Sequence, residues 1–396
     1  MNIRTLVKRI LPDSWVAMLR GMHRLKDYYW QYLSSDGTSK PPRNIDIELT
    51  YRCNARCRMC PLYGDHTGGG DLLLKQAQQN VELSTEELQD LLSTAAHLGV
   101  KQVGFTGGEP FLRKDIIDII RFAESLGLHT ECITNGTPFS KRSVHELVAS
   151  GIRALCISVD GPEKVHDSIR GMPGMFQKID RTIRWINEAK AELKSPAPTI
   201  SIACTVSSLN QGHLHELVPV SKRWKADLYY NRLFYTSPSM ETATNQLFPM
   251  GDVKMEQQDI STEVRQADAA LLAEDFEKCR ILAHELQQPV VIQYDGKQDI
   301  YGSLYQDDYV WYNIDKCMYP WYATRIDPYG NIYPCSMNVN MGNIRAESFE
   351  KIWNGEKYRR FRQTLKRNGM FPKCAKCCVF NRETRLWKWL PRLNIS

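Results

Sequence analysis

The chain has 396 residues, 42% of them apolar, which is enough for one large domain or two to three ordinary ones and excludes a disordered chain. Its 51 basic and 45 acidic residues leave a net charge of +6, too small an excess to predict nucleic acid as a partner. No run approaches the ~18 consecutive apolar residues of a transmembrane helix, and the twelve cysteines come without a secretory signal, so we expect a reducing, cytoplasmic setting in which cysteines bind metals.

The first segment, 1–43, predicts a basic amphipathic helix. Apolar residues recur in it at helical spacing, interleaved with lysines and arginines. We expect this helix to pack on the outside of the domain that follows. Contact with an anionic membrane surface or with a partner protein is the alternative that the same pattern allows.

A strand-like run, 45–50, is followed by three cysteines within eight residues, Cys53, Cys57 and Cys60. Thiolates are the preferred ligands of iron–sulfur clusters, and a cube of four irons needs four of them to be closed. Three ligands in one loop leave one iron open to a small molecule, as an unfilled position does in a catalytic zinc site. A zinc knuckle is the alternative, but the next candidate ligand, His66, lies in a glycine-rich stretch.

Beyond this loop, strand-like and helix-like runs alternate at short spacing. The predicted strands are 45–50, 100–106, 129–134, 154–159, 199–206 and 227–233. Parallel strands need crossover connections, and the crossover helices cover the sheet, so the alternation predicts an α/β fold. Six strands fit either a partial barrel or an open doubly wound sheet, because a complete eight-stranded barrel takes about 250 residues.

Polar and glycine-containing motifs follow three of these strands. They are Thr106-Gly107-Gly108-Glu109-Pro110, Thr134-Asn135-Gly136 and Ser158-Val159-Asp160-Gly161. Adjacent glycines let the backbone approach a ligand closely, while Asn, Ser and Asp either bind a ligand or make caps and turns. Enzymes with parallel sheets build their sites at this edge. Cysteines inside strand-like runs are expected to be small buried residues instead; they are Cys132, Cys156 and Cys204.

The alternation lapses from 235 to 310, which we interpret as a bridging segment with a helix at 262–286 and a short strand at 290–294. A second set of cysteines follows: Cys317, Cys335, Cys374 and Cys377. The turn at 327–330 can return one strand on the next and bring the second of these cysteines toward the first. Four thiolates would close one cube, and a structural zinc is the alternative.

The C-x3-C-x2-C spacing, with Gly-Gly-Glu-Pro one strand later, resembles the signature of the radical S-adenosylmethionine (radical SAM) superfamily. Met59 departs from it, because an aromatic residue usually precedes the third cysteine, although methionine can also pack on adenine. The resemblance implies a partial (β/α)6 TIM-like barrel over 44–234. It also implies a 4Fe–4S cluster on Cys53, Cys57 and Cys60 that binds S-adenosylmethionine, with an electron from a reductase or a flavodoxin-type donor.

The same resemblance assigns the cofactor contacts. It places Gly107, Gly108 and Glu109 at the α-amino group of S-adenosylmethionine. It places Asn135, Ser158 and Asp160 at its ribose and carboxylate, and Arg170 at the methionine carboxylate, where a guanidinium suits bidentate recognition.

The Gly-x4-Cys step downstream of Cys317 resembles the C-terminal extension called SPASM, or its shortened twitch form. It implies an auxiliary domain at 311–381, followed by a tail at 382–396. Because Cys378 is the last cysteine, we predict one auxiliary 4Fe–4S cluster on Cys317, Cys335, Cys374 and Cys377, with Cys378 as a spare or in place of Cys377.

The resemblance implies an oxidoreductase that makes a 5'-deoxyadenosyl radical, and we expect it to abstract hydrogen from a small metabolite, sugar or cofactor precursor. A ribosomally made peptide is the alternative substrate, although 1–43 is short for a peptide-recognition domain. A non-enzymatic barrel that stores clusters or zinc is a third hypothesis, against which an open three-cysteine site argues. The side chain that handles a substrate proton is not predicted.

Overall fold

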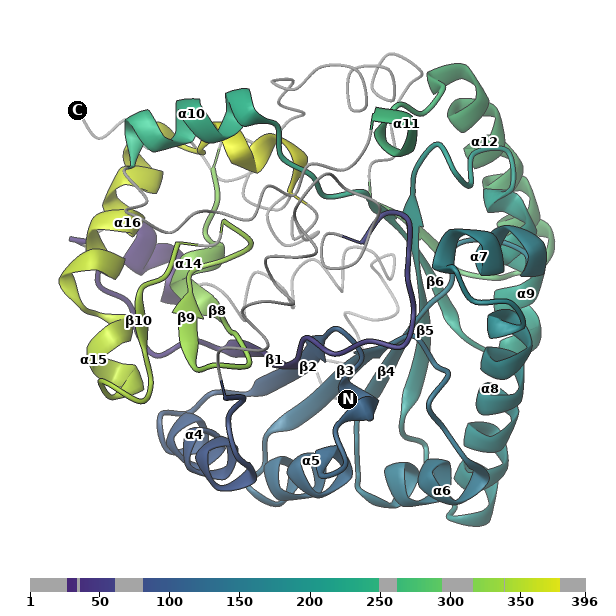
Figure 1. The fold of residues 1–396 in the computed structure, drawn as a ribbon, viewed down its shortest axis with the longest axis horizontal. Helices are drawn as coiled ribbons and strands as arrows, with labels where there is room; N and C mark the ends of the chain where they lie inside the picture. The colour runs from purple at the N-terminus through teal and green to yellow at the C-terminus, as the bar shows by residue number, and fades with distance from the viewer. Residues whose placement is uncertain are drawn as a thin grey trace, which may run out of the picture.

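The computed structural model describes residues 27–33, 36–60, 81–248, 262–293, 316–337 and 339–377. One sheet of ten strands runs through these ranges, in the order β10-β9-β8-β1-β2-β3-β4-β5-β6-β7 (Figure 1). Neighbouring strands are parallel from β8 through β7, and β9 and β10 are added antiparallel. The strands are β1 (Asn44–Thr50), β2 (Gln102–Gly107), β3 (His129–Thr134), β4 (Ala154–Ser158), β5 (Thr199–Val206), β6 (Asp227–Arg232), β7 (Val290–Ile292), β8 (Ala323–Ile326), β9 (Asn331–Tyr333) and β10 (Gly342–Asn343).

Helices cover the outer side of this curved sheet, where α4, α5, α6, α8, α9 and α12 lie in Figure 1. The helices are α4 (Thr85–His97), α5 (Ile116–Ser125), α6 (Lys141–Ala149), α7 (Glu163–Arg170), α8 (Met175–Glu192), α9 (Leu217–Trp224), α10 (Pro238–Leu247), α11 (Thr262–Arg265), α12 (Ala269–Glu285), α14 (Tyr319–Tyr322), α15 (Phe349–Trp353) and α16 (Glu356–Asn368). Three short 3-10 helices are η1 (Pro110–Leu112), η2 (Leu214–Glu216) and η3 (Pro372–Lys376).

The two faces of the sheet differ in chemistry, because side chains alternate along a strand. On β1, Ile45, Ile47 and Leu49 are buried beneath the helices, whereas Asp46 and Glu48 are half-buried on the opposite, inner face. Strands β2 to β6 repeat this alternation. The fold therefore has an apolar core between sheet and helices and a polar inner face.

Local sequence signals explain several element boundaries. Ser84 begins α4 with a capping box, in which its hydroxyl accepts from the Glu87 amide and the Glu87 carboxylate accepts from the Ser84 amide. The predicted helix at 262–286 divides into α11 and α12, because Asp268 adopts an extended conformation and caps α12 by accepting from two of its first amides.

The predicted α/β fold is confirmed, and the six predicted strands are β1–β6. Two further parallel strands extend the array. Residues 290–292, which the sequence analysis placed in a bridging segment, form β7 and pair with β6, while β8 pairs with the other edge at β1. The 17-residue helix α12 is an ordinary crossover to β7. The sequence pattern hides this unit because the long connection before α12 interrupts the alternation.

The N-terminal segment is described only from residue 27. Residues 27–33 are helical, and Tyr32 is buried against Trp321 of α14, with ring centroids 4.9 Å apart. The rest of the predicted amphipathic helix lies outside the described residues. Among the described helices, none combines the length and the apolar character needed to cross a membrane.

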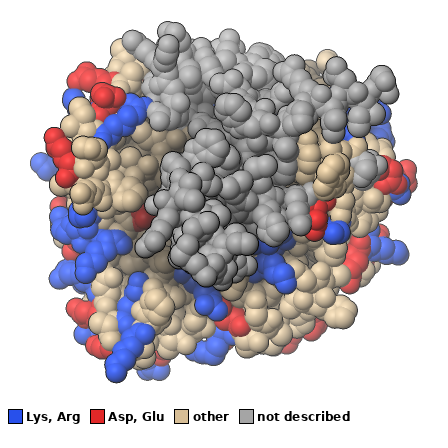
Figure 2. Space-filling view, turned by 180° about the vertical axis from the view of Figure 1, so that it is seen from behind, with Lys and Arg blue, Asp and Glu red and all other residues tan. Residues whose placement is uncertain are grey.

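Charge is distributed evenly on the described part of the surface in Figure 2. Lysines and arginines are interspersed with acidic residues there and do not form one extended basic patch.

Candidate active site with two cysteine sets

The cysteine loop follows β1 and is fixed by the end of α7. The amides of Arg56 and Arg58 donate to the carbonyls of Arg170 and Ile169, at 3.1 and 2.9 Å. Gly171 ends α7 with φ +62, and a Cβ there would lie 2.6 Å from the Arg56 carbonyl oxygen, so glycine allows this close approach. The thiol of Cys57 is buried within the loop, and burial raises the pKa of Cys53.

A buried ion pair lies directly beneath this loop. Arg170 donates through Nε to Asp160 Oδ2 at 2.6 Å, and its Nη1 lies 3.6 Å from the Sγ of Cys57. Asp160 is fully buried, and its other oxygen accepts from the Thr205 amide. Burial disfavours the guanidinium charge, but Asp160 and Cys57 outweigh it and shift the pKa of Arg170 upward. A permanent positive charge therefore faces one of the three thiols.

The Gly-Gly-Glu element packs against the chain just before Cys53. A Cβ on Gly107 would lie 2.3 Å from the Thr50 carbonyl oxygen, and one on Gly108 would lie 2.5 Å from that of Arg52. The Gly108 and Glu109 amides donate to these same two carbonyls, both at 2.8 Å. Glycine is needed at these two positions because the ends of β1 and β2 lie in close contact. This contact positions the start of the cysteine loop.

Glu109 is fully buried at this junction. Its carboxylate accepts from the Thr134 hydroxyl and from the amides of Asn135 and Phe111, at 2.8, 2.7 and 3.1 Å. Burial nevertheless raises the pKa of Glu109 to about 7. A buried carboxylate with a raised pKa is suited to meeting a cationic group, which would restore its charge.

The remaining predicted contact residues lie at the same carboxyl edge. Asn135 donates to the side-chain oxygen of Asn54 in the cysteine loop at 2.7 Å. Ser158 is half-buried at the last position of β4. The structure therefore brings Glu109, Asn135 and Arg170 around the loop, whereas the carboxylate of Asp160 is engaged by internal donors.

His166 belongs to this region and was not predicted. It is fully buried on α7, and its Nδ1 accepts from the Asp160 amide at 3.1 Å. Burial, and then Arg170, lower its pKa well below the ordinary value, so the ring is neutral. The sequence could have indicated His166 through its i, i+4 spacing from Arg170, which places both residues on one face of a helix.

The second cysteine set lines one cavity. Cys317 precedes α14 and Cys335 follows β9. Cys374 lies in η3, and Cys377 directly follows it. The predicted turn is confirmed, because β9 returns antiparallel on β8. Burial raises the pKa of Cys335 to about 12, and the thiol of Cys377 adds to the shift. Crowded buried thiols ionise only where cations compensate them, so this set fits a metal cluster. Cys378 lies outside the described residues.

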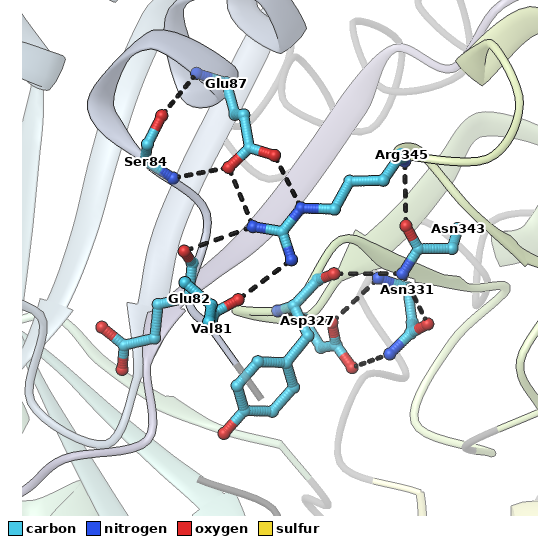
Figure 3. A network of polar contacts seen from close by, with 9 residues as sticks. Val81, Glu82, Ser84, Glu87, Asp327, Asn331, Asn343 and Arg345 are labelled. Atoms are coloured by element: carbon cyan, nitrogen blue, oxygen red, sulfur yellow. Dashed lines mark hydrogen bonds and ion pairs between the residues drawn. The ribbon is translucent and has the colours of Figure 1, made fainter. Parts of the chain in front are cut away.

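The segment between β10 and α15 contacts the start of α4 through Arg345, as Figure 3 shows. Its guanidinium binds both oxygens of Glu87 at 2.6 and 2.8 Å and donates to the carbonyls of Val81 and Glu82. The Glu82 carboxylate in turn accepts from the Thr50 hydroxyl, three residues before Cys53. The sequence could not predict this contact, because its partners lie more than 250 residues apart.

A cluster of polar side chains lies on the inner face of β1. The Tyr319 hydroxyl donates to Asp46 at 2.9 Å, and Arg325 of β8 donates to Glu48 at 2.8 Å. Burial raises the pKa of Asp46 to about 6. Tyr319 also lines the cavity of the second cysteine set. Within the described ranges, no three His, Cys, Asp or Glu side chains converge as a single metal ion requires.

A curved parallel sheet with three thiols at its carboxyl edge and four more around a separate cavity defines an α/β protein with two thiol-rich sites suited to iron–sulfur clusters. The model of the radical SAM superfamily matches residues 47–198, and that of the SPASM iron–sulfur cluster-binding domain matches residues 317–378. The chain therefore carries a radical SAM domain followed by a SPASM domain, which confirms the resemblance. These domains imply a 4Fe–4S cluster, S-adenosylmethionine and an auxiliary cluster, and the thiols fit them.

Similar proteins fall into this family. The "AdoMet-dependent heme synthase" of Methanosarcina barkeri is 28% identical over 354 residues, covering 85% of this chain and 88% of that protein. The "PqqA peptide cyclase" of Rhizobium meliloti is 27% identical over 322 residues, covering 79% and 74%. The structure of Streptococcus suis SuiB bound to S-adenosylmethionine covers 87% of this chain and 71% of that chain with a TM-score of 0.58; at 16% identity it shows a shared fold alone.

Proposed function

We propose that this enzyme cleaves S-adenosylmethionine reductively and uses the resulting 5'-deoxyadenosyl radical to abstract hydrogen from a substrate. Cys53, Cys57 and Cys60 hold the first cluster, which supplies the electron and an open iron when bound. The observation that carries the proposal is the packing of this three-thiol loop against the Gly-Gly-Glu element at the carboxyl edge of the sheet.

The surrounding residues have distinct roles in this proposal. Glu109 meets the α-amino group of S-adenosylmethionine, where the ammonium would return the carboxyl to its charged form. Asn135 and Ser158 contact the rest of the cofactor. Asp160 holds Arg170 in place, and the guanidinium serves both the Cys57 thiolate and the carboxylate of the methionine moiety.

Cys317, Cys335, Cys374 and Cys377 hold one auxiliary cluster, which supplies a second electron-transfer group when bound. Its closed set of four thiols suits a group that exchanges electrons without binding substrate. We propose net oxidation or rearrangement of the substrate, with electrons for the first cluster coming from a reductase or flavodoxin-type protein.

The proposed substrate is a small metabolite, sugar or cofactor precursor. The polar inner face supports this choice, because Asp46, Glu48 and Arg325 can hydrogen-bond a compact polar molecule. The relative named as a heme synthase, which aligns over 88% of its own length, also supports it. The relatives named as PqqA peptide cyclases favour the second candidate, modification of a peptide.

Anaerobic reconstitution tests the reaction. The protein, loaded with iron and sulfide and given dithionite, should convert S-adenosylmethionine to 5'-deoxyadenosine, measured by chromatography. Cys57→Ala should abolish the product, whereas Cys279→Ala, a buried thiol of α12 outside both sets, should retain it. Undiminished product from Cys57→Ala would overturn the proposal. A substrate is then recognised because its deuterated form passes deuterium to 5'-deoxyadenosine.

A further inference from the structure

The last residue of β6 is a buried arginine. Leu228, Tyr230 and Arg232 occupy every second position of this strand, and all three are buried. Side chains at such spacing share one side of a strand, and the first two of these are large and mainly apolar. Arg232 is only 6% exposed, and a guanidinium is rarely buried to this extent unless hydrogen bonds compensate it. Its partners therefore indicate why an arginine stands at the end of this strand.

Two hydrogen-bond partners of Arg232 lie in the turn that carries Cys374 and Cys377. Its Nη2 donates to the Ala375 carbonyl at 2.6 Å and to the Cys377 carbonyl at 3.2 Å. Ala375 lies between the two cysteines, and Cys377 is itself one of the thiols around the cavity. The Cys377 amide donates to the Cys374 carbonyl at 3.0 Å, which closes the turn. One guanidinium thus holds the backbone of this turn at two places.

The chain that continues from β6 contacts the same turn. Phe234 lines the cavity of the second cysteine set. The Lys376 Nζ lies 5.6 Å from the centroid of the Tyr235 ring, a cation–π contact. On α10, the Thr244 hydroxyl accepts from the Lys373 amide at 3.0 Å. The turn with the last two thiols is therefore attached to the sheet through the end of β6 and the segment that follows it.

We propose that Arg232 is a positioning residue of the auxiliary cluster and holds Cys374 and Cys377 in place for ligation; the proposal rests on the assignment of the four cysteines given above. Residues that orient metal ligands through hydrogen bonds typically contribute about 10–100-fold to metal affinity. Arg232 acts in this way through backbone carbonyls and is not itself a ligand. Because β6 belongs to the sheet that carries the first three thiols, the same contact fixes the second set relative to the first.

Iron release tests this role without a substrate. The full chain carrying Cys53→Ala, Cys57→Ala and Cys60→Ala retains the second set alone and, loaded with iron and sulfide, serves as the parent protein. Adding Arg232→Met removes both hydrogen bonds and should make the release of iron to a chelator about tenfold faster. Arg232→Lys keeps a cation with several N–H donors and should recover part of the retention.

Arg113→Met in the same parent is the matched control. Arg113 is also a buried arginine, 8% exposed, and it donates to the Leu49 carbonyl and to Asp115. Its loss should lower the free energy of unfolding and leave iron release near the parent's rate. In the iron-free proteins, amide hydrogen exchange at 374–377 should accelerate in Arg232→Met and not in Arg113→Met. A purely structural role of Arg232 would make the two variants alike.

The outcomes separate the inference from the assignment beneath it. A parent protein that binds no four-iron cluster refutes the cysteine assignment, and the role of Arg232 falls with it. Iron release at the parent's rate in Arg232→Met overturns the positioning role alone, as does equal acceleration in Arg113→Met. Release from Arg232→Lys as fast as from Arg232→Met counts against the hydrogen bonds as the cause. If Arg232→Met does not fold, faster release from Arg232→Gln than from Arg113→Gln supports the role, and equal release overturns it.

Discussion

The two cysteine sites are built in opposite ways. The first takes its three thiols from one loop and surrounds them with Glu109 and Asn135, which follow strands β2 and β3, and with Arg170 at the end of α7. The second collects its thiols from three separated segments around a cavity that aromatic residues and Lys373 also line. A site made by one loop can leave a ligand position open, whereas a site made by several segments encloses its group. This difference agrees with the proposed roles, radical chemistry at the first site and electron transfer at the second.

Among the substitutions that test this comparison, the largest effect is expected at Arg170. Arg170→Met leaves the fully buried Asp160 without its partner, and breaking such a pair costs about 3–5 kcal/mol. The free energy of unfolding, measured anaerobically by denaturant titration, should fall by that amount, and Arg170→Lys should recover part of it. A loss below ~1 kcal/mol in Arg170→Met would show that Asp160 finds another donor.

A second substitution separates the sites by their iron content. Gly108→Ala would place a Cβ 2.5 Å from the Arg52 carbonyl oxygen, so the cysteine loop must move, at a cost of about 1–3 kcal/mol. Bound iron and sulfide should fall to about the share of the second site. Gly127→Ala, where no atom lies within 4 Å, keeps both sites despite its strained φ. Full iron content in Gly108→Ala would show that the contact is dispensable.

The pH dependence of the unfolding free energy tests the first site further, through Glu109. The pKa of Glu109 is raised to about 7, so the folded iron-free chain binds that proton more tightly than the unfolded chain. Stability contributed by this group is present below its ordinary pKa and is lost as pH rises through about 7. Glu109→Gln should reduce the fall in unfolding free energy between pH 4.5 and 7, by on the order of 1 kcal/mol. The pKa of Asp46 is raised to about 6, so Asp46 also makes the unfolding free energy fall over this pH range. Glu109→Gln should leave that contribution of Asp46 unchanged.

The smallest expected effect concerns the contact between Arg345 and the start of α4. Arg345→Ala removes a partly exposed ion pair with Glu87 and should cost about 0.5–1 kcal/mol. Amide hydrogen exchange should accelerate at the start of α4 and leave α12 unchanged. Arg121→Ala, which removes an exposed pair with Asp118 on α5, is the matched control. Unchanged exchange at Glu87 in Arg345→Ala would show that the contact does not hold this end of α4.

The sequence predicts local features of this molecule well and distant ones poorly. The six strands β1–β6 and the return of β9 on β8 follow from short-range patterns, and the structure confirms them. The addition of β7 and β8 to the sheet depends on tertiary pairing that no short pattern records. Likewise, the spacing of the cysteines predicts the first site, but only the fold reveals the Arg170 contact with Cys57, the Arg345 contact with α4 and the Arg232 contact with the second set.

The pairing of β8 with β1 has a consequence for attempts to shorten the protein. β1 leads directly into the cysteine loop, and within the described residues β8 occupies its side opposite β2. Deleting the chain from residue 316 onward would turn β1 into a bare sheet edge, with unpaired amides and carbonyls that invite association between molecules. A truncated barrel is therefore expected to aggregate before it can be assayed. The C-terminal region thus protects the edge of β1, the strand that leads into the loop of the first three thiols, from association between molecules.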